Sequence, residues 1–355
     1  MQEKEMDGQA VEKVSSAPDS RVSNEALALL LDSDVIDMHL ETYTPNRLFG
    51  YDLARRHVKP PLGGRLFGHL DLPRIKDSGL TGAMWSISTN PFRTAEGRWK
   101  LLQRNIEKLK ALVEEREELA LVSTLAAYRA VRQEGRHAVM LSVQGGHALD
   151  AGVAERKLPD PDLMRVTLVH LTGSSIGGTS SPLGFSRHLS EHGMAMVEML
   201  DEARVFVDLA HIHPDSFWEA YVVHDRSLPL LVTHTGVRGV KKHWRNLDDA
   251  QLRAVAQTGG VVGIIFHAGF LKRRGGPRDA RMVVEHIEHA VRVAGEDCVG
   301  IGTDYDGFIV PPSDLRDGAG YALVVQELLD NGMPEQRIRK ILGGNFLRAL
   351  GELRP

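Results

Sequence analysis

The chain has 355 residues, of which 42% are hydrophobic and 25% are charged, so it can bury a sizeable core and does not have the composition of a disordered protein. Its net charge is only −4 with both signs interspersed, which excludes a strongly basic surface; we expect a small-molecule partner, no nucleic acid and no membrane. Cys298 is the single cysteine, so no internal disulfide can form and a cytoplasmic location is expected.

Residues 1–24 are polar and lack the apolar run of a signal peptide, so we expect a flexible N-terminal tail. Residues 25–355 contain no internal repeat and no convincing linker, and we predict that they form a single domain. Nowhere does the chain contain an apolar span of about 20 residues, the length that a membrane helix needs.

From residue 34 onward, short runs of Val, Ile and Leu alternate with longer amphipathic segments, which predicts βα units and a parallel sheet. The eight predicted strands are Val35–Glu41, Ala83–Ser88, Ala138–Val143, Val166–His170, Val205–Leu209, Leu230–His234, Val261–Phe266 and Cys298–Thr303. Predicted helices between them include 104–120, 193–203, 247–260 and 282–295. Eight strands with intervening helices predict an α/β fold, the (β/α)8 TIM barrel, with its functional site at the C-terminal face of the strands.

Two long segments rich in Gly, Pro or Ser, Tyr43–Leu72 and Thr172–Arg187, each follow a predicted strand. In a barrel the loops after the strands form the catalytic face, so we expect both loops to cover the site.

Histidine is concentrated at the ends of the predicted strands. Five of the eight ends carry one, against about one expected by chance for 16 histidines in the chain, which favours a site at that face. These residues are His39, His170, His211, His234 and His267. We expect another four histidines to lie on the surface, namely His224, His243, His286 and His289.

In the stretch VIDMHLET, strand alternation places Asp37, His39 and Glu41 on one face. An imidazole beside a carboxylate suits zinc or a similar divalent ion. A polar strand end with a capping acid is the alternative interpretation.

His211 in VDLAHIHPD and His234 in LVTHTG each follow an apolar strand. Either histidine alone is more often a hydrogen-bonded structural residue. Together, at the ends of neighbouring barrel strands only about 5 Å apart, the two can share an ion.

The last predicted strand runs into IGTDYDG, whose Asp304 and Asp306 are spaced to face one side. An acid at this position can take and return a proton during hydrolysis, whereas Asp and Gly are also ordinary turn residues. Arg245, in HWRNLDD, has the planar fork that suits a substrate carboxylate, although a surface arginine before a helix is the alternative.

These motifs resemble the membrane (renal) dipeptidase family of zinc metallopeptidases, a branch of the metal-dependent TIM-barrel hydrolases. The resemblance extends from about Val35 to Leu350 through nine pieces in order: VIDMHLET, GAMWSIS, SVQGGHAL, RVTLVHLT, VDLAHI, LVTHTGVRGV, HWRNLDD, VGIGTDYDG and GGNFLRAL. It implies two metal ions bridged by a carboxylate and a hydroxide, and the metal-bound hydroxide attacks the amide carbon of a dipeptide.

The same resemblance implies roles for individual residues. His39 and Glu41 would hold one ion, and His211 and His234 would hold the other. His170 would bind the substrate carbonyl and stabilise the oxyanion. The remaining implied roles are proton transfer by Asp304 and binding of the substrate carboxylate by Arg245. A homodimer is also implied.

Two positions depart from the family pattern. Glu41 stands where the family has aspartate, which keeps the charge on a longer arm. Gln144, in LSVQGGH, stands where the family has the bridging glutamate, and its amide offers one neutral oxygen in place of two anionic ones. One or two zinc ions are therefore compatible with the sequence, and our hypothesis is that Glu41 partly replaces the lost carboxylate, holding one ion beside Asp304.

Three functions remain open at this point. The first is a zinc-dependent dipeptidase, or a hydrolase of a related small amide or ester next to a free carboxylate. The second is a non-peptidase member of the family, such as a mononuclear amidase, an esterase or a tailoring enzyme for a specialised metabolite. The third is a catalytically inactive binding protein.

Overall fold

The computed structural model describes residues 19–57 and 61–355. Its strands are β1 (Ile36–Leu40), β2 (Gly82–Ser88), β3 (Leu119–Leu121), β4 (His137–Gln144), β5 (Arg165–Thr167), β6 (Phe206–Asp208), β7 (Leu231–Thr235), β8 (Val261–Ile264) and β9 (Val299–Ile301). Its α-helices are α1 (Asn24–Leu31), α2 (Tyr43–Phe49), α3 (Leu72–Asp77), α4 (Ala95–Glu114), α5 (Leu125–Gln133), α6 (Asp150–Val153), α7 (Glu191–Glu202), α8 (Pro214–Val223), α9 (Asp249–Gln257), α10 (Ala268–Leu271), α11 (Arg281–Ala294), α12 (Gly320–Asp330), α13 (Glu335–Arg339) and α14 (Asn345–Leu353).

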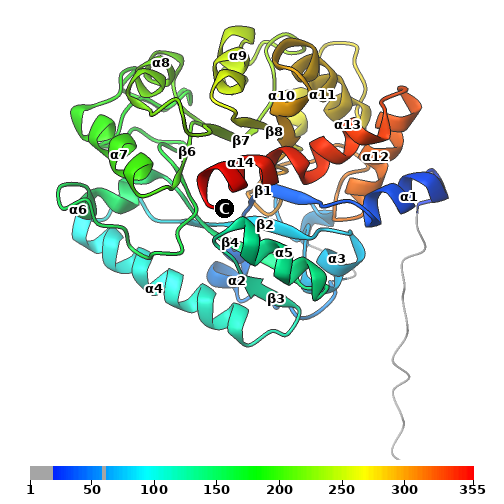
Figure 1. Ribbon diagram of the computed structural model, residues 1–355, viewed down its shortest axis with the longest axis horizontal. Coiled ribbons are helices and arrows are strands. Elements are labelled where there is room, and N and C mark those ends of the chain that lie inside the picture. The colour runs from blue at the N-terminus through cyan, green and yellow to red at the C-terminus, as the bar shows by residue number, and fades with distance from the viewer. Residues whose placement is uncertain (1–18, 58–60) are drawn as a thin grey trace, which may run out of the picture.

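Eight of these strands close into a parallel barrel. The order around the ring is β1, β2, β4, β5, β6, β7, β8 and β9, and β9 pairs with β1 again. Helices surround the ring, as Figure 1 shows. Each of the eight predicted strands overlaps one strand of the ring, so the predicted TIM barrel is confirmed.

The ninth strand, β3, occupies the end of a segment that we predicted to be helical. The segment 104–120 was predicted to be helical throughout, but α4 ends at Glu114, and Leu119 already pairs with His137 at the start of β4. The short β5 pairs only with the second half of β4, from Ser142 onward. β3 therefore satisfies the backbone groups on this side of the first half of β4.

The N-terminal end of the barrel is sealed by α14. This helix lies across the opening in Figure 1. Its Phe346 and Leu350 are buried in one cluster with apolar residues of the barrel interior. Those interior residues are apolar and almost fully buried, namely Ile36, Met38, Met84, Met140, Met164, Phe206 and Val261. This end of the barrel interior is thus a packed apolar core.

The predicted tail, residues 1–24, falls largely outside the described residues, which begin at 19. Its described end is attached to the barrel, because Arg21 Nη1 lies 2.8 Å from Asp314 Oδ2 and α1 already begins at Asn24. Within the described residues, no helix is both long enough and apolar enough to cross a membrane.

Candidate metal centre and active site

A cavity of about 810 Å³ opens at the C-terminal ends of the strands. Six residues that the sequence places at strand ends line it, namely Glu41, Gln144, His170, His211, His267 and Asp304. Both predicted covering loops border this face: α2, inside the first loop, contributes Arg47 and Leu48, and a second cavity is lined partly by Gly173 and Phe185 of the other loop.

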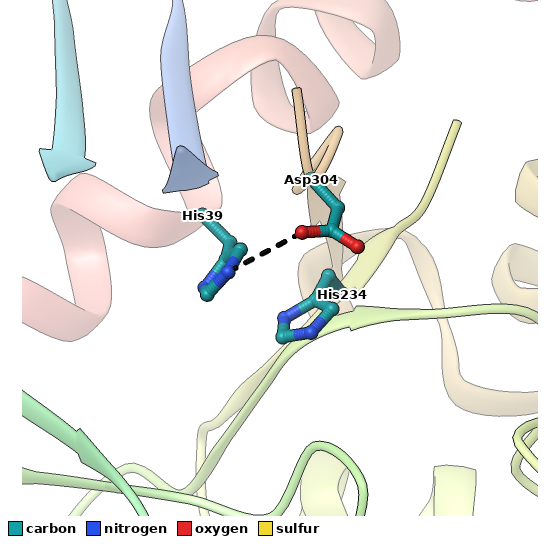
Figure 2. Close-up of side chains that lie close together, drawn as sticks. All are labelled: His39, His234 and Asp304. Atoms are coloured by element: carbon teal, nitrogen blue, oxygen red, sulfur yellow. Dashed lines mark ion pairs between the residues drawn. The ribbon is translucent and has the colours of Figure 1, made fainter. Parts of the chain in front are cut away.

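Figure 2 shows the centre of this face, where His39, His234 and Asp304 point toward one another from β1, β7 and the loop after β9. One potential ligand atom from each lies within 4.8 Å of the others, and all three residues are buried. His39 Nε2 is 3.5 Å from Asp304 Oδ1, and the two imidazole rings stack with centroids 3.9 Å apart. Two imidazoles and a carboxylate in a buried cluster suit a divalent metal ion.

Glu41 lies beside this cluster, with its Oε1 3.6 Å from His39 Nε2. Thr44 Oγ1 donates to Glu41 Oε2 at 2.5 Å, and Ser88 Oγ donates to Oε1 at 3.1 Å. Burial alone would raise the pKa of Glu41, but its interaction with His39 and the hydrogen bond from Thr44 outweigh burial and hold that pKa below its ordinary value. Glu41 is therefore an anionic neighbour of the cluster.

Asp37 does not share this face, contrary to the predicted alternation. β1 has an irregularity between Asp37 and Leu40, where the pairing with β2 slips by one residue. Asp37 instead accepts hydrogen bonds from Tyr321 on α12 and from Thr303, and burial raises its pKa to about 6. The irregularity thus separates an acid that anchors α12 from the two residues that reach the cavity.

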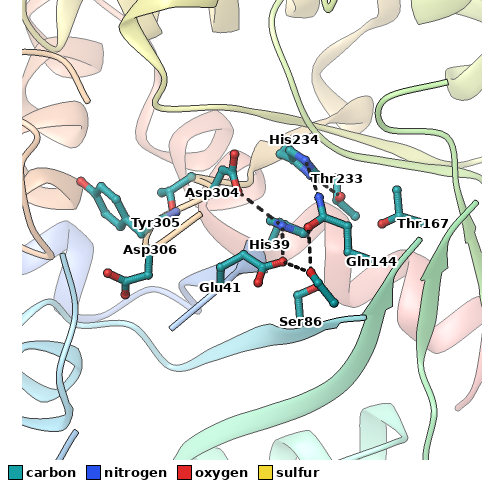
Figure 3. Close-up of polar contacts among 12 residues, drawn as sticks. His39, Glu41, Ser86, Gln144, Thr167, Thr233, His234, Asp304, Tyr305 and Asp306 are labelled. Atoms are coloured by element: carbon teal, nitrogen blue, oxygen red, sulfur yellow. Dashed lines mark hydrogen bonds and ion pairs between the residues drawn. The ribbon is translucent and has the colours of Figure 1, made fainter. Parts of the chain in front are cut away.

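His211 and His234 form a pair, as their positions after neighbouring strands predicted. Their Nε2 atoms are only 2.8 Å apart, and Gln144 Nε2 lies 3.2 Å from the first and 3.4 Å from the second. Figure 3 shows the Gln144 amide between His234 and the carboxylate of Glu41, and Ser88 Oγ is within 3.4 Å of Gln144 Oε1. Gln144 therefore contacts His211 and His234 directly and is linked to Glu41 through Ser88.

Hydrogen bonds determine which ring nitrogen of His234 carries the proton. Thr233 Oγ1 donates to Asp208 Oδ2 at 2.7 Å, so the same hydroxyl accepts from His234 Nδ1 at 2.9 Å. The other ring nitrogen, Nε2, therefore carries its lone pair toward His211 and the cavity. A histidine whose second nitrogen donates to a fixed partner is the usual arrangement of a metal ligand, so the residues present fit a divalent ion.

The backbone is strained at two of the site residues. His211 has φ +66° and Asp304 has φ +62°. These values lie in the left-handed region, which residues other than glycine rarely adopt. Such conformations cost of the order of 1–3 kcal/mol and concentrate at functional sites, where the surrounding structure enforces them.

Burial controls the protonation of the other two predicted catalytic residues. Burial lowers the pKa of His170 to about 4, and its ring meets that of His211 edge-on at 4.7 Å. Burial and the nearby charge of Glu41 raise the pKa of Asp304 well above its ordinary value. His267 also lines the cavity, with its ring edge against Phe270.

Arg245 is buried in the loop between β7 and α9, outside the set of residues that line the cavity, and its Nη2 donates to the backbone carbonyl of His234 at 2.6 Å. Burial lowers the pKa of its guanidinium to about 10. Two other arginines, Arg47 and Arg93, line the cavity itself. These two were not predicted from the sequence, because Arg47 lies on the short helix α2 and Arg93 in the loop before α4, and the approach of both segments to the cavity depends on tertiary packing.

Asp306 points away from Asp304, as Figure 3 shows. Its carboxylate accepts from the backbone N–H groups of Gly68 and His69 at 2.8 Å and from the hydroxyl of Thr42. Asp306 therefore anchors the loop 43–72, and the predicted common orientation of the two acids is wrong.

Three of the histidines predicted to be on the surface are buried, and each is hydrogen-bonded. His224 contacts Asp201 at 2.8 Å, His286 accepts from the backbone N–H of Val237 at 2.8 Å, and His289 lies 2.7 Å from Asp249. His224 and His289 thus join neighbouring helices, and His286 joins α11 to the loop after β7, roles that amphipathic periodicity does not reveal.

The closed parallel barrel, with a buried cluster of possible metal ligands at its C-terminal face, has the architecture of the TIM-barrel metallohydrolases. The chain belongs to the membrane dipeptidase family, Peptidase family M19, whose model matches residues 23–354. It is therefore a member of the amidohydrolase-like superfamily, as the sequence motifs indicated.

Solved structures share the fold along nearly the whole chain. A metallo peptidase from Rhodobacter sphaeroides, liganded with a phosphinate mimic of the dipeptide L-Ala-D-Ala, is 24% identical with a TM-score of 0.75, covering 90% of this chain and 99% of its own. An amidohydrolase from Pseudomonas aeruginosa is 23% identical with a TM-score of 0.74, covering 92% and 98%. The probable dipeptidase PvdM from Pseudomonas aeruginosa is 18% identical with a TM-score of 0.77, covering 93% and 98%.

Proposed function

We propose that the protein is a metal-dependent hydrolase that cleaves a dipeptide or a related small amide bearing a free carboxylate. The observation that carries this proposal is the convergence of imidazole, carboxylate and amide groups on one cavity at the C-terminal face of the barrel. Membership of a family of metallopeptidases supports it, as does the dipeptide mimic bound by the relative from Rhodobacter sphaeroides.

Five residues are the candidate metal ligands: His39, Glu41, Gln144, His211 and His234. These residues would hold a divalent ion, which would supply a Lewis acid for a carbonyl oxygen and would lower the pKa of water. Zinc is our choice of metal, because imidazole and carboxylate donors suit it.

The protein's own groups supply the remaining steps. His170, which burial keeps neutral at physiological pH, donates a hydrogen bond to the substrate carbonyl as negative charge develops on its oxygen. Asp304 accepts a proton from the attacking water and returns it to the leaving amine. Arg245 binds the substrate carboxylate, as the resemblance implies, and Arg47 adds a second cation on the cavity wall.

A second candidate is a non-peptidase member of the family that hydrolyses a bulkier amide or ester. Two observations favour it: Gln144 in place of the bridging acid, and the size and apolar walls of the cavity. About 810 Å³ falls within the range of pockets that hold drug-sized ligands, and Leu48, Leu101 and Phe308 line its sides.

We extend the proposal to a homodimer in the cytoplasm. The family resemblance supports the dimer, and a single cysteine, Cys298, which is buried as a free thiol, supports a reducing compartment. The molecular mass in solution tests the dimer.

The decisive experiment is a panel of dipeptides and small amides and esters, assayed with added zinc, cobalt or manganese for the wild type and for Gln144→Glu. Cleavage of dipeptides by the wild type supports the first function, and cleavage by the Glu variant alone favours the second. His234→Ala is the matched control for contaminating peptidases. If neither protein cleaves any member of the panel while both are folded and metal-loaded, the hydrolase proposal is wrong.

A further inference from the structure

Arg165 is a fully buried arginine inside the barrel, directly below the cluster. It projects from β5, and its guanidinium contacts side chains from four other strands, at Ser86, Ser142, Asp208 and His39. Its Nη1 lies 2.9 Å from Asp208 Oδ2, which forms a fully buried ion pair. Burying this charge costs free energy unless its N–H groups are hydrogen-bonded. Each group that contacts the guanidinium must therefore act as a hydrogen-bond acceptor.

The contact with His39 determines which ring nitrogen of that histidine carries the proton. Arg165 Nη2 lies 3.1 Å from His39 Nδ1, and a guanidinium can only donate. His39 Nδ1 therefore accepts, and a neutral imidazole must then hold its hydrogen on Nε2. This nitrogen lies 3.6 Å from Glu41 Oε1 and 3.5 Å from Asp304 Oδ1, and it has no hydrogen-bond partner among the described residues.

His234 has the opposite arrangement within the same network. Its Nδ1 donates to Thr233, whose hydroxyl donates to Asp208, the partner of Arg165. One buried ion pair thus sets two facing histidines in opposite tautomers: His234 presents a lone pair to the cavity, and His39 presents an N–H. Of these two, only His234 can bind a metal ion as a neutral ligand without moving its proton. His211 donates from Nε2 to His234 Nε2 here, but its Nδ1 has no fixed partner among the described residues and can take up that proton, whereas Arg165 occupies Nδ1 of His39.

We propose that the protein binds one divalent ion, on the His211–His234 side of the cavity, and that His39, held by Arg165, serves as a hydrogen-bond donor and not as a metal ligand. This inference rests on the proposed hydrolase function and narrows its site. It differs from the two-ion centre that the family resemblance implies, and it replaces the hypothesis that Glu41 holds the single ion.

The charges around the cluster favour the same stoichiometry. Glu41 and Asp208, whose pKa values are held below their ordinary range, contribute two negative charges, and Arg165 and Arg245 contribute two positive ones. Asp304 and Asp37 are the other acids nearby, and burial raises the pKa of both. Even with both of these acids ionised the sum is −2, so one divalent ion brings it to 0 and a second raises it to +2 in a buried space. The second ion is therefore strongly disfavoured in this chain.

Metal content after equilibrium dialysis against Zn²⁺ tests the stoichiometry without any assay of activity. We expect about one ion per chain in the wild type and in His39→Asn, and less than a fifth of that in His211→Asn and His234→Asn. Thermal melting identifies any variant that fails to fold. Two ions in the wild type, or loss of the ion in folded His39→Asn, would overturn the proposal.

The role of Arg165 is tested by restoring the bridging acid. Gln144→Glu alone should still bind one ion, whereas Gln144→Glu combined with Arg165→Met should bind two; adding Asp208→Asn removes the unpaired acid should the double variant not fold. Two ions in Gln144→Glu alone, or one ion in the folded combined variant, would contradict the role of Arg165.

The tautomer of His39 has its own readout. In ¹⁵N-histidine spectra, the signal that disappears in His39→Asn should carry its proton on Nε2 and should not move when Zn²⁺ is added; the opposite tautomer, or a zinc-induced shift, would overturn the assignment. Hydrolysis by a protein with two ions would refute this inference and leave the proposed function standing. One ion bound at His211 and His234 without any hydrolysis would support this inference and refute the proposed function.

Discussion

Buried histidines at the two ends of the barrel differ in their hydrogen bonding. At the N-terminal end, His137 is fully hydrogen-bonded: its Nδ1 donates to the Leu80 carbonyl at 3.0 Å, and its Nε2 accepts from Trp85 Nε1 at 3.2 Å. At the C-terminal end, His39 Nε2 and His211 Nδ1 are buried without a hydrogen-bond partner among the described residues. The first end is complete without a ligand, whereas the second is arranged to receive one.

The residues that stabilise the fold and the residues proposed for catalysis thus lie at opposite ends of the barrel. The N-terminal end contributes apolar packing under α14, and the C-terminal end holds titratable groups and residues in the left-handed region, among them His211 and Asp304. Changes at the C-terminal end should therefore alter catalysis with little unfolding, and changes at the N-terminal end should unfold the protein without altering its chemistry.

Asp304→Asn should show the largest effect on catalysis. The amide keeps the shape of the side chain but cannot take up a proton from water, so we expect kcat for whichever substrate the wild type cleaves to fall by about 10²–10⁴. Thermal melting should change little, because the only ionisable group within 4.0 Å of the Asp304 carboxylate among the described residues is the imidazole of His39, at 3.5 Å, and burial lowers the pKa of that imidazole and favours its neutral form. A large drop in melting temperature would break the proposed separation.

Phe346→Ala should show the largest effect on stability. Phe346 is 1% exposed and packs inside the N-terminal end, so its truncation should cost about 3–5 kcal/mol of the free energy of unfolding in urea. Phe92→Ala, at a residue that is 90% exposed, is the matched control and should stay within about 0.5 kcal/mol of the wild type. At a temperature where both variants are folded, their kcat values should match that of the wild type.

The protonation of His137 should make stability depend on pH. Burial lowers the pKa of its imidazole from 6.5 to about 4, so between these values the unfolded chain takes up a proton that the folded protein rejects. A protonated ring would also turn a second donor toward the Trp85 N–H. The contribution of His137 is thus fully present above pH 6.5 and is lost by about 1.4 kcal/mol per unit as the pH falls toward 4.

His137→Gln isolates this effect, because the glutamine amide can donate to Leu80 and accept from Trp85 without titrating. The free energy of unfolding of wild type minus variant, measured in urea from pH 7.5 to 4.5, should decline as the pH falls. The other histidines titrate equally in both proteins and cancel. Parallel curves would show that His137 does not titrate in this window.

The sequence predicted the barrel well because its signals are local. Each strand of the ring is an apolar run, and eight such runs alternating with amphipathic segments leave few other folds. β3 was missed because three residues at the end of a helical pattern carry too little periodicity to separate them from α4.

Strand ends also predicted which side chains converge, since the carboxyl ends of parallel strands meet at one face. Arg165 could not be found in this way. It points into the barrel from the start of β5, and its effect depends on Asp208 and His39, which are 43 and 126 residues away in sequence. The side chain that sets the tautomers of the cluster is thus defined only by tertiary contacts.

Arg47→Met should show the smallest effect and would sharpen the contrast within the cavity itself. Arg47 is half-buried on the cavity wall, and its Nε has no hydrogen-bond partner among the described residues, so it is free to bind a substrate carboxylate. We expect KM for a substrate with a free carboxylate to rise about tenfold with kcat unchanged, and KM for the amidated substrate to stay constant. The exposed Arg93 also lines the cavity, and its replacement by Met should change KM less than about fivefold, since solvent screens its charge. Equal effects of the two variants would mean that general electrostatic attraction, and not a specific contact with Arg47, brings the carboxylate to the site.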